Sequence, residues 1–177
     1  MPAKQGNSRN KLKIKRLTTY ALMTAFCLII GYIEGVLSLS LTALMPGVKL
    51  GLSNAMALTL VCVGDKKGAV AVNITRILLS ALLFGSPISL VFSLSGGISS
   101  LAVICILSRL KSVSELGMSI ASGATHNVFQ CIAAIIFVGA GTIYYMPLLI
   151  AIGAACGVVC GTLSKLIIKK VKTNAIF

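Results

Sequence analysis

The chain has 177 residues, of which 57% are hydrophobic and 11% are charged, and its mean hydropathy is +1.01. This composition excludes a soluble domain with an ordinary polar surface. The formal net charge of +13 does not indicate a nucleic-acid partner, because the basic residues flank apolar segments and do not form one face with interleaved aromatic residues.

Long apolar stretches dominate the chain from residue 17 onward. We expect six membrane-spanning segments, at about 17–40, 51–64, 68–84, 87–108, 114–139 and 143–164. The predicted fold class is an all-α integral membrane protein, a bundle of six transmembrane helices. Its predicted domains are a basic cytoplasmic tail at 1–16, a membrane domain at 17–168 and a second basic tail at 169–177.

The cations alternate between the two sides of the predicted bundle. Fourteen of the sixteen belong to one side, namely Lys4, Arg9, Lys11, Lys13, Lys15, Arg16, Lys66, Lys67, Arg109, Lys111, Lys165, Lys169, Lys170 and Lys172. The other side holds Lys49, and Arg76 lies inside a span. Short cytoplasmic loops carry the excess Lys and Arg of membrane proteins, so both ends are predicted to be cytoplasmic. The same residues attract anionic membrane lipid.

The first apolar segment follows a basic stretch, as a signal peptide would. Its apolar run of about twenty residues is longer than the core of a signal peptide. Cleavage would also move the new N-terminus outside and break the charge alternation. We therefore interpret it as a retained helix.

The segment after the first span, residues 41–50, is apolar but contains Pro46 and Gly47, and Gly51 follows it. Proline removes a backbone donor and glycine frees the backbone, so we expect an outer loop that dips toward the membrane. The second span, at 51–64, is too short to cross about 30 Å alone. A short, broken helix of this kind indicates a binding site within the membrane.

Small residues recur at a spacing of four in the first and last spans. The sixth span carries Gly153, Gly157 and Gly161, a pattern that permits close helix approach, either inside the bundle or between two copies of the chain. Ala21 and Ala25 form a similar pair in the first span. The fifth span is expected to start near Ser114, with Glu115 in its first turn.

Polar residues inside apolar spans need a partner or a role, because ionisable groups there cost about 2.5–3.5 kcal/mol each on insertion scales. With the topology above, such residues from five helices fall near the midplane or in the outer half of the membrane. This common depth predicts one substrate-binding cavity reached from outside. The candidate residues are Glu34, Lys49, Asn54, Asn73, Arg76, Ser93, Ser95, His126, Asn127 and Gln130.

Structural roles compete with ligand binding for several of these residues. Arg76 and Glu34 are candidates for a structural ion pair, and His126 for a core histidine with satisfied hydrogen bonds. As a set, Lys49 and Arg76 against Glu34 make the pocket net positive. A positive pocket predicts an anionic or acceptor-rich small-molecule ligand.

Catalytic and cofactor motifs are missing from the sequence. No Gly-x-x-x-x-Gly-Lys-Ser/Thr loop is present, and the three acids, Glu34, Asp65 and Glu115, are far apart, so no aspartate cluster holds Mg²⁺ against a diphosphate. All six cysteines fall within spans with no nearby His or carboxylate, so we expect packing residues and not metal ligands. The chain is predicted to be neither an enzyme nor a cofactor protein.

Four motifs in order resemble a known family. They are Pro46-Gly-Val-Lys-Leu-Gly-Leu-Ser-Asn54, Arg76-Ile-Leu-Leu-Ser-Ala-Leu-Leu-Phe-Gly-Ser86, Ser93-Leu-Ser-Gly-Gly97 and His126-Asn-Val-Phe-Gln130. Over about 17–165 the chain resembles the Gx transporter family, often labelled heptaprenyl diphosphate synthase component I. That family is similar to the substrate-binding S components of energy-coupling factor (ECF) importers of the bacterial cell membrane.

The resemblance implies a function and partners. It implies a six-helix subunit that captures a vitamin, cofactor or quinone/isoprenoid precursor from outside and works with a shared transmembrane subunit and two ATPases. It also implies that Ala21 and Ala25 dock on the shared subunit. The family label implies the alternative, a non-catalytic membrane component of a heptaprenyl diphosphate synthase in menaquinone biosynthesis. A channel is disfavoured, because the inner halves of the spans lack a polar line.

Overall fold

The computed structural model describes residues 3–44, 51–110 and 112–173, and the secondary structure of these residues is entirely helical. One 3-10 helix, Ala140–Tyr145, precedes the last α-helix. The α-helices are α1 (Ala3–Leu44), α2 (Asn54–Cys62), α3 (Lys66–Phe84), α4 (Pro87–Leu107), α5 (Glu115–Val138) and α6 (Met146–Thr173).

Among the described residues, five helical segments are long and apolar enough to cross a membrane, and α2 is not among them. The chain is therefore an all-α membrane protein built as a helical bundle. With nine residues, α2 rises about 13 Å, well short of a bilayer core of about 30 Å. The prediction that the second apolar segment is too short to cross the membrane alone is confirmed. That the chain crosses the membrane six times, with both ends in the cytoplasm, stays a prediction.

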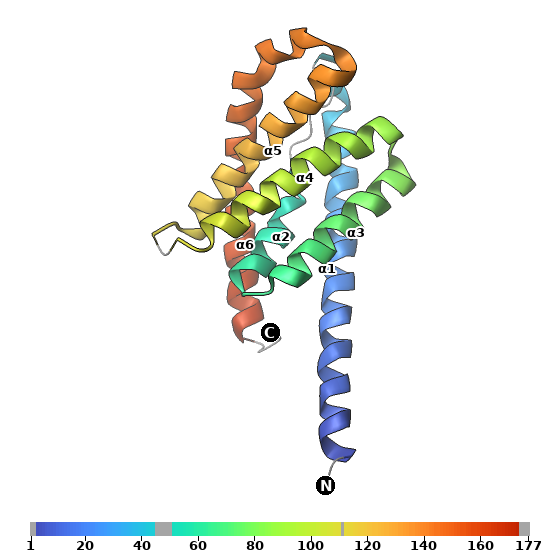
Figure 1. The fold of residues 1–177 in the computed structure, drawn as a ribbon, viewed down its shortest axis with the longest axis vertical. Helices are drawn as coiled ribbons and strands as arrows, with labels where there is room; N and C mark the ends of the chain where they lie inside the picture. Colours follow the sequence, from blue (N-terminus) through green and yellow to red (C-terminus); the bar gives the residue numbers. More distant parts are fainter. Residues whose placement is uncertain (1–2, 45–50, 111, 174–177) are drawn as a thin grey trace.

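The first helix is longer than the sequence pattern indicates. It runs without a break from Ala3 to Leu44, about 63 Å at 1.5 Å per residue, so the stretch expected to be a tail is helical from residue 3. No proline lies within it, and Lys, Arg, Gln, Leu and Ala favour helix. Its N-terminal part projects beyond the other helices, at the end of the molecule where α6 also ends (Figure 1).

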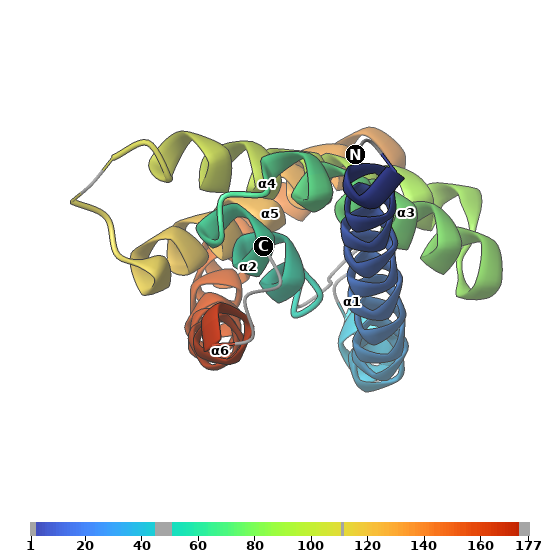
Figure 2. The ribbon, with the colours of Figure 1, turned by 90° about the horizontal axis from the view of Figure 1, so that it is seen from below.

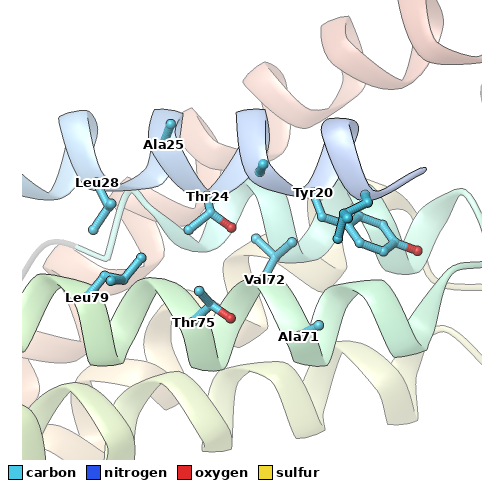
Figure 3. Close-up of a pocket in the computed structure, with 10 residues that line it drawn as sticks. Tyr20, Thr24, Ala25, Leu28, Ala71, Val72, Thr75 and Leu79 are labelled. Atoms are coloured by element: carbon cyan, nitrogen blue, oxygen red, sulfur yellow. The ribbon is translucent and has the colours of Figure 1, made fainter. Parts of the chain in front are cut away.

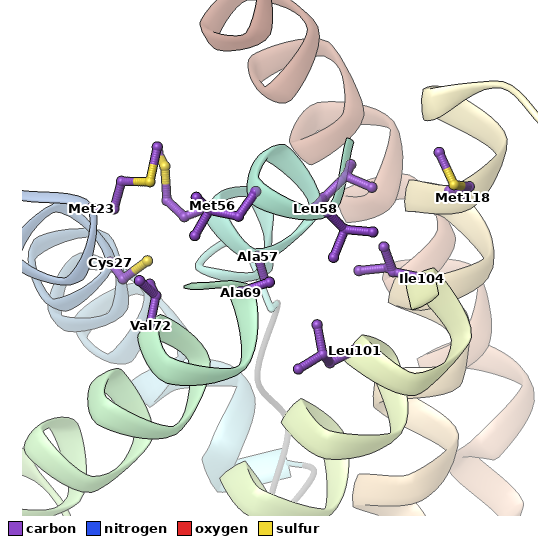
Figure 4. Close-up of a cluster of buried hydrophobic side chains, with 12 residues drawn as sticks. Met23, Cys27, Met56, Ala57, Leu58, Ala69, Val72, Leu101, Ile104 and Met118 are labelled. Atoms are coloured by element: carbon purple, nitrogen blue, oxygen red, sulfur yellow. The ribbon is translucent and has the colours of Figure 1, made fainter. Parts of the chain in front are cut away.

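The short helix α2 occupies the centre of the bundle. It contacts each of the five longer α-helices and lies between α6 and α3 in the view from below (Figure 2). Residues 54–61 are all buried, as expected for a helix that is apolar all round. Its Met56 and Leu58 meet Met23 of α1, Val72 of α3 and Ile104 of α4 in the main apolar core (Figure 4).

The helices α5 and α6 form the closest pair, and glycines allow it. A Cβ atom built on Gly123 would lie 2.2 Å from the carbonyl oxygen of Gly153, and one on Gly157 would lie 2.7 Å from Ile120 Cα. Both neighbours are backbone atoms of the facing helix. The glycine pattern of the sixth span therefore serves packing inside the bundle, one of the two roles considered above.

Three helices begin with side-chain caps. Asp65 accepts the Gly68 N–H before α3, and Ser86 accepts the Ser89 N–H before α4. Ser114 accepts the Gly117 N–H, which confirms the predicted start of α5 at Glu115. The Asp65 cap has a second function, because its other carboxylate oxygen accepts the hydroxyl of Tyr20 from α1.

Asp65 thus links α1 to the start of α3, and its removal should cost more than an ordinary cap. We expect Asp65→Ala to lower the free energy of unfolding by about 2 kcal/mol, because it removes the cap and the partner of Tyr20 together. Ser86→Ala, which removes a cap alone, should cost about 1 kcal/mol. Thermal unfolding of both variants in detergent measures the difference, and equal losses would contradict a contribution from Tyr20.

Candidate functional site

The candidate site is built around the turn at residues 51–53 that leads into α2. Gly51 adopts a φ of 76°, a left-handed conformation that favours glycine. The backbone N–H groups of Gly51 and Leu52 both donate to the carboxylate of Glu34 on α1, at 2.6 and 3.1 Å. The carboxylate therefore fixes the turn from the side of α1.

Arg76 on α3 is the main hydrogen-bond donor of the site. Its Nε and Nη2 donate to Asn73 Oδ1 at 3.0 and 2.8 Å, and Nη2 also donates to Asn54 Oδ1 at 2.5 Å. Its Nη1 donates to the hydroxyl of Ser53. The side chain is 9% exposed, so the guanidinium charge is surrounded by protein oxygens.

The donors of Arg76 determine how the neighbouring amides are oriented. Asn54 and Asn73 must each turn their oxygen to Arg76, because a guanidinium can only donate. The Asn73 nitrogen then donates to the carbonyl of Gly97 on α4 at 2.9 Å, and the Asn54 nitrogen lies 3.1 Å from His126 Nδ1. Since the amide nitrogen donates, Nδ1 accepts and the ring proton is on Nε2.

His126 on α5 packs against two glycines. A Cβ on Gly96 of α4 would lie 2.8 Å from the His126 ring and 2.9 Å from Gln130 Cγ. A Cβ on Gly51 would lie 3.2 Å from the same ring. Glycine at both positions brings the backbones of the turn and of α4 close to α5.

Asn127 and Gln130 complete the α5 part of the site. The Asn127 nitrogen donates to the carbonyl of Leu149 on α6 at 2.8 Å. The buried atoms Asn127 Oδ1 and Gln130 Nε2 have no hydrogen-bond partner among the described residues.

Ser93 and Ser95, two further predicted site residues, lie on α4. The hydroxyl of Ser93 donates to Ser89 O and that of Ser95 to Phe92 O, both within α4. Lys49 lies outside the described residues. The structure thus brings together Glu34, Asn54, Asn73, Arg76 and His126 as one connected network, with Asn127 and Gln130 beside it.

Sequence reasoning missed three residues that hold the turn. Ser53 precedes α2 without capping it, because its hydroxyl accepts from Arg76. The thiol of Cys27 donates to the carbonyl of Ser53 at 3.4 Å, and that of Cys160 to the carbonyl of Leu52 at 3.4 Å. The sequence indicated Ser53 only through its position next to Asn54, a predicted site residue. No sequence signal indicated a site role for Cys27 or Cys160. The cysteines in the described part of the chain are free thiols, and no metal-binding group of three residues occurs there.

A separate apolar groove of about 410 Å³ runs between α1 and α3 (Figure 3). Ala21 and Ala25 lie on its α1 side and are exposed. Thr24 and Thr75 are the polar side chains in the middle of the groove, and the hydroxyl-bearing Tyr20 closes one end. The lining residues are Leu17, Tyr20, Ala21, Thr24, Ala25, Leu28, Ala71, Val72, Thr75 and Leu79.

These features define a helical membrane protein with a buried, charged hydrogen-bond network at its centre. The family model of heptaprenyl diphosphate synthase component I matches residues 23–167, which include the network and most of the groove but not Leu17, Tyr20 and Ala21. The chain belongs to this family, as its motifs indicated. No curated protein and no solved structure matches the chain.

Proposed function

We propose that the chain is the substrate-capture subunit of an ECF-like importer in the bacterial cell membrane. Its ligand would be a vitamin, a cofactor or a quinone/isoprenoid precursor taken from the outer face, and both chain ends would be cytoplasmic. The observation that supports this role is the network around Arg76. It joins the turn before α2 to α1, α3 and α5 through side chains. Ionisable groups inside a membrane cost free energy, so their presence there supports a functional role.

The importer role requires energised partners, and α1 offers a surface for them. Ala21 and Ala25 are exposed at the edge of the α1–α3 groove, where a partner helix can approach closely. Purification of the tagged chain from its host membrane, followed by native mass spectrometry, tests the proposal. We expect a transmembrane subunit and two ATPases in the complex, and a complex without any ATPase would overturn it.

A second candidate function is the one in the family's name, a membrane component of heptaprenyl diphosphate synthase. The projecting start of α1 favours it, because Lys11, Leu12, Lys13 and Ile14 are exposed there and offer a surface to a soluble enzyme. The same purification separates the two candidates. A soluble prenyl synthase subunit in place of ATPases would identify this role.

The docking role of α1 has its own test. We expect Ala25→Leu to lower recovery of the partner subunits by about tenfold, because the added side chain blocks close approach of a helix, a loss of about 1.4 kcal/mol in binding. The thermal midpoint of the isolated chain should not change, since Ala25 is exposed. Ala102→Leu is the matched control, because Ala102 is an exposed alanine of α4 away from the groove. Equal recovery of partners with both variants would remove α1 as the docking surface.

A further inference from the structure

The groove between α1 and α3 contains a buried threonine whose hydroxyl has no partner. Thr24 of α1 is 7% exposed, and Thr75 of α3 lies opposite to it in the middle of the groove (Figure 3). Neither hydroxyl forms a hydrogen bond with the described residues. The other threonines whose side chains the structure describes donate to a backbone carbonyl of the preceding turn, namely Thr18, Thr19, Thr59, Thr125, Thr142 and Thr162. Buried polar groups without a partner are rare in native structures, so Thr24 indicates a ligand in the groove.

The groove has the length of a lipid chain in one leaflet of a membrane. It follows α1 from Leu17 to Leu28, about 17 Å at 1.5 Å per residue and about half of a bilayer core of about 30 Å. Apart from Tyr20 and the two threonines, its lining is aliphatic. One turn beyond Leu28, the rings of Tyr32 and Phe84 lie 5.1 Å apart and bridge α1 to α3. This end of the groove therefore suits an apolar chain.

Cations lie at the other end of the groove. Arg16 precedes Tyr20 by one helical turn and interacts with it electrostatically. Lys67 precedes Ala71 by one turn on α3, and both cations are exposed. Asp65 also lies at this end, but both of its carboxylate oxygens accept hydrogen bonds within the protein. Exposed Lys and Arg side chains at the end of an apolar groove fit the headgroup of an anionic lipid.

We propose that the groove binds one molecule of an anionic phospholipid. Its phosphate lies at Arg16 and Lys67. Its ester oxygens, which are acceptors, bind the hydroxyls of Thr24 and Thr75, and one acyl chain continues along the aliphatic part toward the ring pair. The head, ester and chain of the lipid thus follow one another in the same order as the cations, hydroxyls and aliphatic side chains of the groove. The inference concerns a site outside the buried network and does not depend on the importer role.

Lipids with the same chains and different headgroups test the ligand class. The probes are phosphatidylglycerol, which is anionic, and phosphatidylcholine, which is zwitterionic. For the full chain in detergent, we expect phosphatidylglycerol to raise the thermal midpoint by about 3 °C at a concentration near ten times its dissociation constant. Phosphatidylcholine at the same concentration should raise it by about a third as much or less, because the two cations attract it less. Native mass spectrometry should show one retained molecule of phosphatidylglycerol.

Three results with these probes would overturn the inference. They are equal shifts by the two lipids, no shift by either lipid, and a shift by inorganic phosphate as large as that by phosphatidylglycerol. The last result would mean that the cations bind an anion without any chain in the groove.

The variant Lys67→Gln tests the place of the headgroup. It should lower the affinity for phosphatidylglycerol by about fivefold, the effect of one cation near an anionic lipid surface. Lys165→Gln is the matched control, because Lys165 is an exposed lysine of α6 that does not line the groove. Equal losses of affinity with both variants would show attraction to the whole basic surface and would contradict a defined site.

Two further variants test the groove itself. Thr24→Val keeps the shape of the side chain and removes the donor, so it should lower the affinity for phosphatidylglycerol by about fivefold without lowering the midpoint of the lipid-free chain. Ala71→Phe fills the groove from an exposed position and should abolish the shift, whereas Ala102→Phe on α4 should not. If Ala71→Phe instead lowers recovery of partner subunits and leaves the lipid shift unchanged, the groove holds a partner helix and the inference is wrong.

Discussion

Replacing Gly123 by alanine is expected to cost about 3 kcal/mol of folding free energy, enough to leave much of the protein aggregated after extraction. The added methyl group would lie 2.2 Å from the carbonyl oxygen of Gly153, and backbone atoms cannot rotate away as a side chain can. The helices α5 and α6 must therefore move apart along the most extensive contact of the bundle. The fraction of monodisperse protein on size exclusion and the thermal midpoint measure the effect.

Gly31→Ala is the matched control for this prediction. Gly31 lies inside α1, and a Cβ there meets nothing within 4 Å. Alanine favours helix over glycine by up to about 1 kcal/mol, so this variant should be as stable as the parent or more so. Substitution of glycine by alanine is thus expected to destabilise the protein at Gly123 and not to destabilise it at Gly31. Similar midpoints for the two variants would refute the close α5–α6 contact.

The regular elements could be predicted because local signals mark them. Ser114 with Glu115 and Ser86 with Pro87 mark helix starts, and apolar runs of about twenty residues mark the spans. The long α1 was missed, since the basic residues before 17 indicate a solvated tail but are also good helix formers. Charge predicts the side of the membrane, not the backbone conformation.

The candidate site could be predicted as a set of residues but not as a network. Glu34, Asn54, Arg76 and His126 were grouped because they were predicted to lie at a similar depth in the membrane. The structure brings these residues together. Depth carries no information on rotation about the helix axis, so it could not show that the hydroxyls of Ser93 and Ser95 donate to Ser89 O and Phe92 O within α4. It also cannot show which donor meets which acceptor. A count of charges could not show that Arg76 donates to Ser53, Asn54 and Asn73.

The network around Arg76 should be the most sensitive polar feature of the fold. We expect Arg76→Met to lower the free energy of unfolding by about 3–5 kcal/mol, because it removes a buried positive charge that interacts with the Glu34 carboxylate. It also removes the donors that Asn54 and Asn73 accept from. Arg76→Lys should recover only part of this loss, since an ammonium group cannot replace a planar fork with donors on two edges.

A double-mutant cycle separates the charge interaction from the packing of the arginine side chain. Glu34→Gln removes the negative charge and keeps one of the two oxygens that accept the Gly51 and Leu52 N–H groups. In the Arg76→Met background, this second change should cost about 1–3 kcal/mol less than it does alone, because the interaction between the two charges is already lost. Thermal unfolding of the four proteins gives the coupling. Additive losses would mean that Glu34 and Arg76 stabilise the turn independently, and the network would then be a set of local hydrogen bonds and not a charge pair acting through residues 51–54.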